Sequence, residues 1–277
     1  MADQEGFNKA QKLNVEVTQL GTPATAAQAL VGGSLDVASA SADAYIVAIE
    51  QGADIVLVSQ EIGNPSFTVV AQPEIKSWDH LKGGTIAVSG ATDGAANVFR
   101  LMARQHGMEA QKDYSFVPVG TTPARYAALK AKQVKGAIMT EALTIQALGD
   151  GFSMIERSNL RHYTFIVNAV SRPWAQDHRD LLTRFVKGQA QAADWLYQPA
   201  NKQAAIDVLA STVKISNDVA TKTYDDYITN GQGQIVTRDA KVDMEGLKNM
   251  GDVLKSLDLI KQVDVNRWAD NSYAGGS

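Results

Sequence analysis

The sequence repeats one pattern of strand, turn, helix and strand at two places that are 99 positions apart. Residues 15–38 and 114–137 align without a gap. The alignment pairs Gly21 with Gly120, Thr22 with Thr121, Leu30 with Leu129, Leu35 with Val134 and Ala38 with Ala137. In each copy, a β-type segment leads to a Gly-Thr turn, a short helix and a second strand. Two copies of one βαβ unit predict two similar lobes, an arrangement that usually holds a small molecule in the cleft between them.

The order of the other elements indicates the fold class. Further strands are expected at residues 54–59, 67–71, 85–89 and 163–170, with helices between them. After Pro173, apolar residues recur at helical spacing and predict a helical C-terminal part. Alternating strands and helices predict an α/β protein with a parallel sheet in each lobe.

Composition excludes several functional classes. The chain has 277 residues and a net charge of -4, and it shows no basic stripe with interleaved aromatic residues, so no nucleic-acid partner is expected. It has no cysteine, which excludes disulfides, Cys-ligated zinc and thiol catalysis. The four histidines are far apart and lack metal-ligand spacing, so surface or capping roles are expected. We expect neither a metal site nor a cofactor.

The chain shows no membrane-spanning or export segment. No apolar run approaches the ~20 residues that a transmembrane helix needs. The N-terminal residues lack the basic and then apolar pattern of a signal peptide. If the protein is exported, its signal is expected to have been removed from this chain.

The repeat also predicts that the first lobe lacks its opening strand. The second copy is preceded by a strand at residues 85–89 and a helix at about 94–106. The offset places Met1 opposite Arg100, inside that helix. The first lobe therefore lacks a strand and most of a helix, roughly 20 residues. A truncated sequence, a swapped strand or a differently closed sheet would each account for this.

Several segments resemble the ABC-transporter solute-binding proteins of the nitrate/sulfonate/taurine and thiamine-pyrimidine-like group. The resembling motifs lie, in order, at residues 4–17, 29–38, 75–89, 192–195 and 263–273. The family's first strand is absent here. Lys135 stands where the second-lobe motif normally repeats the acid seen at Asp36, and Glu141-Ala142 replaces a frequent proline.

The resemblance implies a two-lobed periplasmic-binding-protein fold of the type II kind. Lobe one would comprise residues 1–73 and 163–277, and lobe two residues 74–162. The hinge would lie near 64–74 and 158–168. The resemblance further implies that the protein delivers a captured solute to a membrane permease from a periplasmic or other extracytoplasmic location.

Ligands of parallel sheets bind beyond the carboxyl ends of the strands, which identifies the candidate site residues. In lobe one the strand ends are residues 39–41 and 61–64, and in lobe two they are residues 89–93 and 140–141. The candidates there are Ser39, Ser41, Asn64, Ser89, Ala91, Thr92, Asp93, Thr140 and Glu141. The repeat places Ser41 and Thr140 at equivalent positions. The segment 89–94 precedes a helix, so its free N–H groups could also bind an anion.

Most of these residues have a structural interpretation as well. Asp93 and Glu141 are first interpreted as helix-start carboxylates, with a role in the ligand cleft as the alternative. Arg125 is expected on a solvated helix face, although it could pair with an anion. Thr121 and Thr122 are expected to cap that helix, and Asn64 to form a turn near the hinge.

Phe67 and Tyr163 are expected in the core, with a ligand-stacking wall as the alternative. Three functions remain open from the sequence. The first is a solute receptor of an ABC importer, a monomer or a strand-swapped dimer. The second is an enzyme of the same fold, of a pyrimidine or menaquinone pathway. The third is a ligand-sensing domain.

Overall fold

The computed structural model describes residues 2, 5–160, 162–230 and 235–274, and for Glu141 it describes the backbone alone. The chain divides into two compact units. Unit 1 comprises Met1–Leu20, Thr25–Asn64 and Arg161–Ser277. Unit 2 comprises Gly21–Ala24 and Pro65–Leu160. Unit 1 is therefore assembled from segments that lie on both sides of unit 2 in the sequence.

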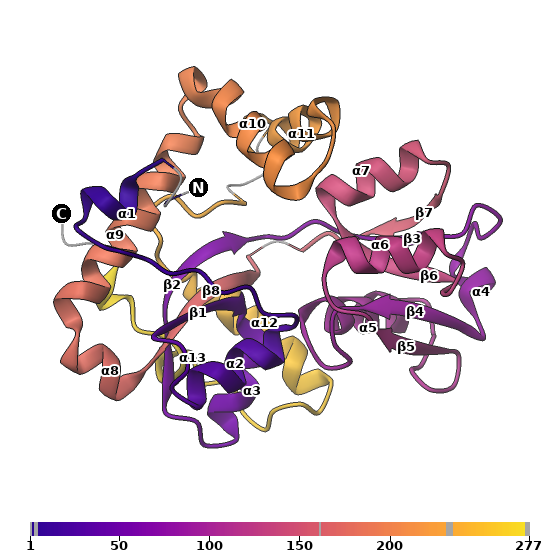
Figure 1. Cartoon of the computed structure of the whole chain (residues 1–277). Coiled ribbons are helices and arrows are strands. Elements are labelled where there is room, and N and C mark those ends of the chain that lie inside the picture. Colours follow the sequence, from indigo (N-terminus) through magenta and orange to yellow (C-terminus); the bar gives the residue numbers. More distant parts are fainter. Residues whose placement is uncertain (1, 3–4, 161, 231–234, 275–277) are drawn as a thin grey trace. The chain divides into compact units, whose positions relative to one another are not determined.

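Unit 1 contains a small sheet and a long helical part (Figure 1). Its strands are β1 (Val37–Ser41), β2 (Ile55–Gly63) and β8 (Thr164–Ser171). The helices before β8 are α1 (Phe7–Ala10), α2 (Pro23–Val31), whose first two residues group with unit 2, and α3 (Ala42–Glu50). Those after β8 are α8 (Arg172–Asp177), α9 (Arg179–Leu196), η1 (Pro199–Asn201), α10 (Lys202–Val213), α11 (Asn217–Tyr224), η2 (Asp225–Thr229), α12 (Met244–Ser256), α13 (Val265–Trp268) and η3 (Asn271–Tyr273).

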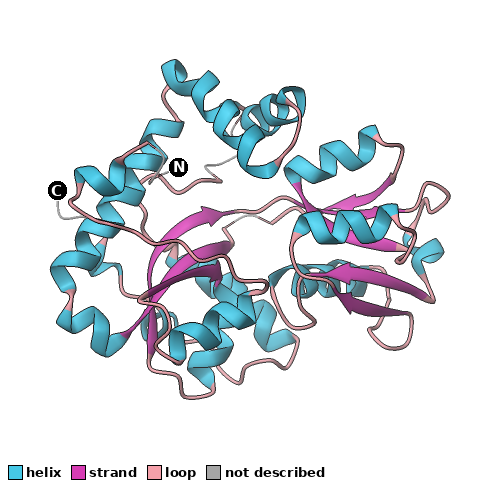
Figure 2. Cartoon of the chain, in the orientation of Figure 1, coloured by secondary structure: helices cyan, strands magenta, loops and turns pink. Residues whose placement is uncertain are grey.

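Unit 2 alternates strands and helices (Figure 2). Its strands are β3 (Phe67–Ala71), β4 (Gly84–Val88), β5 (Tyr114–Pro118), β6 (Gly136–Thr140) and β7 (Ser153–Arg157). Its helices are α4 (Trp78–Leu81), α5 (Gly94–Gln105), α6 (Thr122–Lys130) and α7 (Glu141–Gly149). The predicted α/β class is therefore seen in the arrangement of the elements.

The sheet of unit 1 corrects the expectation of a parallel sheet in each lobe. Its strand order is β1-β8-β2, and β8 pairs antiparallel with both neighbours. The prediction rested on the alternation of strands and helices along the chain, which does not say which strands become neighbours. Instead β8, which returns from unit 2, lies between them and satisfies the inner backbone groups of both.

The sheet of unit 2 is mixed and has the order β5-β4-β6-β3-β7. Strand β4 pairs parallel with β5 and with β6, whereas β3 pairs antiparallel with β6 and with β7. The carboxyl ends of β4, β5 and β6 therefore share one edge of the sheet.

The sequence repeat is reproduced in the two sheets. Strand β1 corresponds to β6 at the offset of 99 positions, and each is followed directly by a helix, α3 or α7. Ser41 pairs with Ile166 on β8, and its counterpart Thr140 pairs with Phe67 on β3. The three-stranded order β1-β8-β2 thus matches β6-β3-β7. Among the described residues, unit 1 has no counterpart of β4.

Residues 15–20 form no strand, although the repeat predicts one there. Their counterpart β5 is held by parallel pairing with β4 alone. Because the described part of unit 1 lacks a strand equivalent to β4, residues 15–20 have no ladder to join. Val17 remains 78% exposed as a result. The strand prediction for this segment was wrong because local β-propensity does not form a strand without a partner.

Separate apolar clusters stabilise the units. In unit 1, Val56 on β2 and Val170 on β8 pack against Leu182 and Val186 on α9. In unit 2, Phe99 on α5 lies 5.0 Å from Tyr114 and 5.6 Å from Phe116, measured between ring centroids. Such edge-to-face contacts stabilise aromatic clusters.

The core expectation for Phe67 and Tyr163 is confirmed, because both side chains are buried. The helical part that follows β8 has its own cluster, centred on Ile206 and Tyr224. None of the helices in the described residues is both long enough and apolar enough to cross a bilayer.

Candidate functional site

The shared carboxyl edge of β4, β5 and β6 gathers most of the predicted site residues of unit 2. Backbone hydrogen bonds continue past the ends of β4 and β5. Val119 N–H donates to the Val88 carbonyl over 2.9 Å, and Gly120 N–H donates to that of Ser89 over 3.2 Å. Ser89 and the turn before α6 are therefore held side by side.

Asp93 stands at the start of α5 and is nearly buried, with 4% exposure. It has the extended backbone of an N-cap residue, but its side chain makes no capping hydrogen bond. Its Oδ1 instead accepts from the Ser89 hydroxyl over 2.7 Å, and its buried Oδ2 has no hydrogen-bond partner among the described residues. The capping interpretation is therefore right about position and wrong about the bond.

The charge state of Asp93 reflects two opposing effects. Burial raises the pKa of the carboxyl, because the charged form loses solvation. The Ser89 hydroxyl and the positive charge of Arg125 lower the pKa by a smaller amount. A ligand that donated a hydrogen bond to Oδ2 would compensate this carboxylate for its lost solvation.

The loop between Ser89 and Asp93 is exposed at Ala91 and Thr92. Its carbonyls are held from α5. Arg100 Nη2 donates to the Ala91 carbonyl over 2.5 Å, and Asn97 Nδ2 donates to that of Thr92 over 3.1 Å. The loop backbone is therefore held by side chains of α5, while Ala91 and Thr92 remain accessible to solvent.

Arg125 corrects the expectation of a solvated helix face, since the residue is only 4% exposed. Its Nη2 donates to Thr122 Oγ1 over 2.5 Å, and its Nη1 donates to the Gly120 carbonyl over 3.4 Å. Its Nε is buried without a hydrogen-bond partner in the described part of the chain. Burial lowers the pKa of Arg125 to about 10, and the nearby charge of Asp93 opposes that shift. The guanidinium therefore remains charged at neutral pH.

The two threonines at the start of α6 have different roles from the predicted capping. Thr121 is the N-cap residue, but its side chain makes no capping bond. Thr122 accepts the bond from Arg125, and its Oγ1 lies 3.4 Å from Oγ1 of Thr140, at the end of β6. Glu141 begins α7, and its side chain lies outside the described residues.

Three helices begin at this edge. Helix α5 follows Asp93, α6 follows Thr121 and α7 follows Thr140. Helix N-termini carry unpaired N–H groups and a partial positive charge, which favour anions. Together with Arg125, they give the edge a positive potential that Asp93 offsets only in part. This polar edge of unit 2, formed by Ser89, Asp93, Thr122, Arg125 and Thr140, is called the β4–β6 edge site below.

Unit 1 has a second group of polar atoms, at the carboxyl ends of β1 and β2. Ser41 ends β1 and begins α3, and its buried Oγ has no partner among the described residues. The hydroxyl of Tyr45, one turn along α3, is also buried and without a partner there. Burial raises the pKa of Tyr45, and the charge of Glu61 adds to the shift. Tyr45 and Glu61 therefore interact electrostatically, and Ser41 precedes Tyr45 by one helical turn; the three residues are called the unit 1 polar group below.

Glu61 on β2 belongs to the strand end 61–64 that the sequence identifies, although it was not among the candidate site residues. Burial raises the pKa of its carboxyl, opposed by hydrogen bonds from Asn168 and from the exposed Ser39. The sequence feature that could have indicated its role is its position as a charged residue near the end of an apolar strand, Ile55–Gly63. Such a position is unfavourable unless the carboxylate has partners.

Asn64 is the last residue of a unit 1 segment, where the chain passes into unit 2. Its Oδ1 accepts from the Tyr163 N–H over 3.1 Å, and its own N–H donates to the Tyr163 carbonyl over 2.8 Å. Its backbone is left-handed, with φ at 45°, which asparagine tolerates better than most residues. The predicted turn role is confirmed, while its predicted ligand contact stays a prediction.

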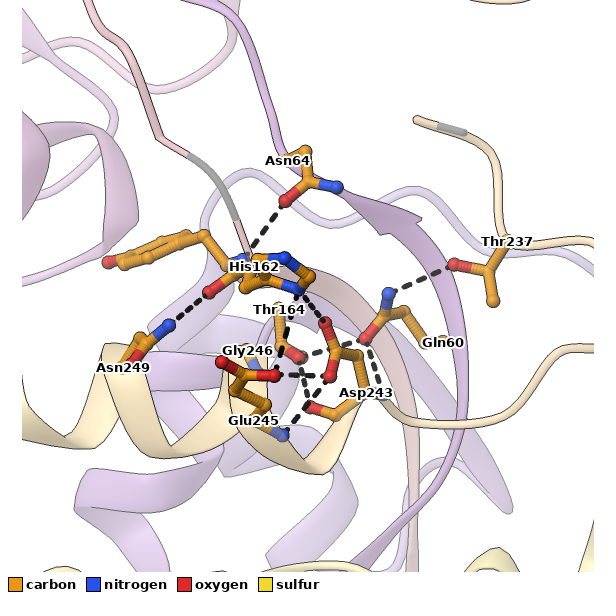
Figure 3. A network of polar contacts seen from close by, with 10 residues as sticks. Gln60, Asn64, His162, Thr164, Thr237, Asp243, Glu245, Gly246 and Asn249 are labelled. Carbon is orange, nitrogen blue, oxygen red and sulfur yellow. Dashed lines mark hydrogen bonds and ion pairs between the residues drawn. The ribbon is translucent and has the colours of Figure 1, made fainter. Parts of the chain in front are cut away.

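A hydrogen-bond network lies beside Asn64 within unit 1 (Figure 3). Thr164 donates to Gln60 Oε1 over 2.9 Å, and Gln60 Nε2 donates to Thr237 over 2.9 Å. Asp243 N–H also donates to Gln60 Oε1, and the Asp243 carboxylate caps α12. The network therefore joins β2, β8 and the start of α12 within unit 1.

Comparison with known protein families shows to which family the chain belongs. The sequence matches the family described as NMT1/THI5 like over residues 1–202. The chain belongs to the NMT1/THI5-like family. No curated protein matches this NMT1/THI5-like chain significantly.

Solved structures show the fold of this NMT1/THI5-like protein. The alkanesulfonate-binding protein SsuA from Xanthomonas axonopodis pv. citri, bound to MOPS, matches with a TM-score of 0.79 and 16% identity, over 97% of this chain and 92% of that chain. The nitrate-binding protein NrtA from Synechocystis PCC 6803 matches with a TM-score of 0.71 and 16% identity, over 96% and 83%. A Candida albicans protein with the generic periplasmic-binding-protein fold matches with a TM-score of 0.79 and 17% identity, over 100% and 92%. The chain has the periplasmic-binding-protein fold.

The predicted site residues of the NMT1/THI5-like chain thus fall into three places. Ser89, Asp93 and Thr140 lie at the β4–β6 edge site, with the exposed Ala91 and Thr92 on the adjoining loop. Ser39 and Ser41 lie on β1. Asn64 lies in the boundary network. Arg125 and Thr122 were assigned other roles from the sequence, and they join the site only through burial and hydrogen bonding.

Proposed function

We propose that this protein is a solute-binding receptor of an ABC importer. The family, the fold and the β4–β6 edge site support this function. The single observation that carries it is the buried, charged Arg125 with an unpartnered Nε, beside three helix N-termini and the partly compensated Asp93. The named sulfonate and nitrate structures are themselves binding proteins.

The proposed ligand is a small organic anion that also carries a hydrogen-bond donor. The helix N-termini and Arg125 favour an anionic group such as a sulfonate or carboxylate. The Oδ2 of Asp93, which has no partner among the described residues, and the partly buried carboxylate of Glu61 favour a donor on the same molecule. An amino- or hydroxy-substituted sulfonate combines both features.

We further propose that the ligand binds between two lobes and favours their closed state. The lobes would be residues 1–73 with 163–277, and residues 74–162, with the hinge near 64–74 and 158–168. The paired backbone bonds of Asn64 and Tyr163 lie within these hinge segments. A ligand that contacts both lobes shifts the population toward closure by its differential affinity for the closed state.

The proposed partner is the membrane permease of the importer, and the proposed location is extracytoplasmic. Receptors with this fold present their closed form to a permease, so ligand binding and docking would be coupled. The polar group of Ser41, Tyr45 and Glu61 would supply the lobe-one contacts of the ligand.

Thermal denaturation with a ligand panel tests the proposal. The panel contains taurine, MOPS, nitrate, short carboxylates and neutral aminopyrimidines. A true ligand at 100 times its Kd is expected to add about 2.7 kcal/mol of stability. X-ray scattering should show a smaller radius of gyration with the same ligand. If no member of the panel shifts the melting temperature, the receptor assignment loses its support.

Two serine variants test the site. Ser89→Ala removes the hydroxyl that orients Asp93 and is expected to weaken binding about tenfold, which corresponds to the ~1.4 kcal/mol of one hydrogen bond to a charged group. Ser34→Ala is the matched control, because Ser34 is exposed and lies outside the polar groups. Equal affinities of the two variants would exclude Ser89 from the site.

A further inference from the structure

The β4–β6 edge site places a buried carboxyl group and a buried guanidinium at one edge of the sheet. Asp93 and Arg125 are each 4% exposed. The charge of each residue affects the pKa of the other, so the two groups interact electrostatically. Asp93 Oδ2 and Arg125 Nε both lack a hydrogen-bond partner among the described residues. The site therefore holds an unsatisfied acceptor and an unsatisfied donor.

The unsatisfied oxygen of Asp93 has little room for a partner. Its Oδ1 already accepts from the Ser89 hydroxyl over 2.7 Å. A Cβ at Gly90 would lie 2.8 Å from Oδ2, so the loop backbone closes over this oxygen. A proton on Oδ2 needs no further space, and it also removes a charge whose burial is unfavourable.

Few charged groups face Asp93. Arg125 on α6 and Arg100 on α5 interact with it electrostatically. The neighbouring strands β3, β4 and β6 carry no titratable side chain. Helix α7 begins with Glu141, whose side chain lies outside the described residues. The protonation of Asp93 therefore depends on two arginines, on Glu141 and on any charged ligand that binds at this edge.

A bound anion changes the electrostatic balance at Asp93. The anion's charge opposes the ionised carboxylate and screens the favourable charge of Arg125. The pKa of Asp93, which burial already raises, therefore rises further when a simple anion binds. An ammonium group on the same ligand has the opposite effect, because its positive charge stabilises the carboxylate.

We propose that Asp93 determines which anions the β4–β6 edge site accepts: a simple anion binds together with one proton, which Asp93 takes up from solvent, whereas an anion with an ammonium group binds without proton uptake. The proposal rests on the proposed receptor function and specifies the ligand class and the pH dependence of the same site. The proton forms a bond to the Asp93 carboxylate, and no other covalent bond changes.

The sign of the pH dependence follows from linkage. Because a simple anion raises the pKa of Asp93, its affinity increases as pH falls below the pKa in the complex. The increase is up to about tenfold per pH unit, and it ends below the pKa in the free protein. The affinity for an ammonium-bearing anion should change little over the same range.

Isothermal titration calorimetry with two matched probes tests the proposal. Ethanesulfonate and taurine differ by a single amino group, and neither changes its charge between pH 5.5 and pH 7.5. Titrations in buffers of different ionisation enthalpy give the number of protons taken up per ligand. Ethanesulfonate should bind the parent at least about fivefold more tightly at pH 5.5 than at pH 7.5. It should take up close to one proton where its affinity falls most steeply, and taurine should take up none.

Asp93→Asn removes the titrating group and should reverse the preference of the site. Ethanesulfonate should bind this variant without proton uptake, equally at both pH values, and more tightly than the parent at pH 7.5. Taurine should bind at least about tenfold more weakly, because its ammonium group loses the carboxylate. Asp252→Asn is the matched control, since Asp252 is exposed and pairs across the surface with Lys248. Its affinities should equal those of the parent.

Glu141→Gln distinguishes the other carboxyl group of this edge, and it should retain the proton uptake. Three results would overturn the proposal. The first is ethanesulfonate binding to the parent with equal affinity at both pH values and no proton uptake, which requires no variant to fold. The second is proton uptake that is lost in Glu141→Gln and kept in Asp93→Asn. The third is the absence of ethanesulfonate binding to the parent at pH 5.5.

Failure of the receptor function would give a different result. In that case the probes would bind, with or without proton uptake, while X-ray scattering would show no closure with any ligand. The proton count of the parent would still decide the role of Asp93. Conversely, closure with a ligand and no proton uptake with ethanesulfonate would keep the receptor function and exclude the role of Asp93.

Discussion

The Ser89 hydroxyl donates to Oδ1 of Asp93 over 2.7 Å, and this bond is the principal hydrogen bond to a nearly buried carboxylate. The bond does not fully compensate for burial, because the pKa of Asp93 remains raised. The folded state therefore favours protonated Asp93 more than the unfolded chain does. The associated stability is fully present below the unfolded pKa of about 3.9 and is lost as pH rises through the folded pKa.

Asp93→Asn is accordingly expected to remove a pH-dependent loss of stability. Its free energy of unfolding relative to the parent should be more favourable at pH 7 than at pH 4. Urea denaturation at the two pH values measures the difference. If the difference in unfolding free energy between Asp93→Asn and the parent is the same at pH 4 and at pH 7, the pKa of Asp93 is equal in the folded and unfolded states.

Thr122→Ala should destabilise unit 2 by about 1–3 kcal/mol, because Arg125 Nη2 loses its partner in a buried position. Thr121→Ala is the matched control, since Thr121 is exposed and its side chain makes no capping bond. A change within about 0.5 kcal/mol is expected for it. Urea denaturation of both variants measures the effect, and equal losses would contradict the role given to Thr122.

Gly251→Ala should destabilise unit 1 by about 1–3 kcal/mol through overpacking. A Cβ at Gly251 would lie 2.8 Å from two ring carbons of Trp268, which is fully buried, and 2.9 Å from Val263. Gly149→Ala is the control, because a Cβ there meets nothing within 4 Å. Thermal denaturation should separate the variants. An unchanged melting temperature for Gly251→Ala would mean that the Trp268 ring can move.

Gln60→Leu should cost about 1–3 kcal/mol, because Thr164, Thr237 and the Asp243 N–H lose their common partner (Figure 3). Gln203→Leu is the control, since Gln203 is exposed and bonds only across the surface to Asp207. Urea denaturation reports both. Equal stability of the two variants would mean that water replaces Gln60 in the network.

The internal repeat was enough to predict the α/β class and the equivalent positions of Ser41 and Thr140, because these depend on local pattern and on the order of elements along the chain. It failed at residues 15–20 and in the direction of pairing in unit 1. Both depend on which strands become neighbours, and β8 comes from more than 100 positions further along the chain.

The loop residues of the candidate site could be predicted from the sequence, whereas its charged side chains could not. Ser89, Asp93 and Thr140 follow from strand ends. The burial of Arg125 could not be predicted from strand ends or from helical spacing. It depends on hydrogen bonds to Gly120 and Thr122, at the start of the same helix. Glu61 lies in a strand end that the sequence identified, but its role was missed, since its partners Ser39 and Asn168 lie on two other strands.

The central position of β8 has a consequence for biosynthesis. During translation, β1 and β2 leave the ribosome long before Thr164–Ser171, and they have no contact with each other in the finished sheet. Residues 65–160 can complete their own sheet meanwhile. The strands β1 and β2 therefore stay unpaired while about 100 further residues are synthesised, which takes roughly 5–20 s at ordinary elongation rates. Chaperones that hold nascent chains should bind that segment rather than the later one.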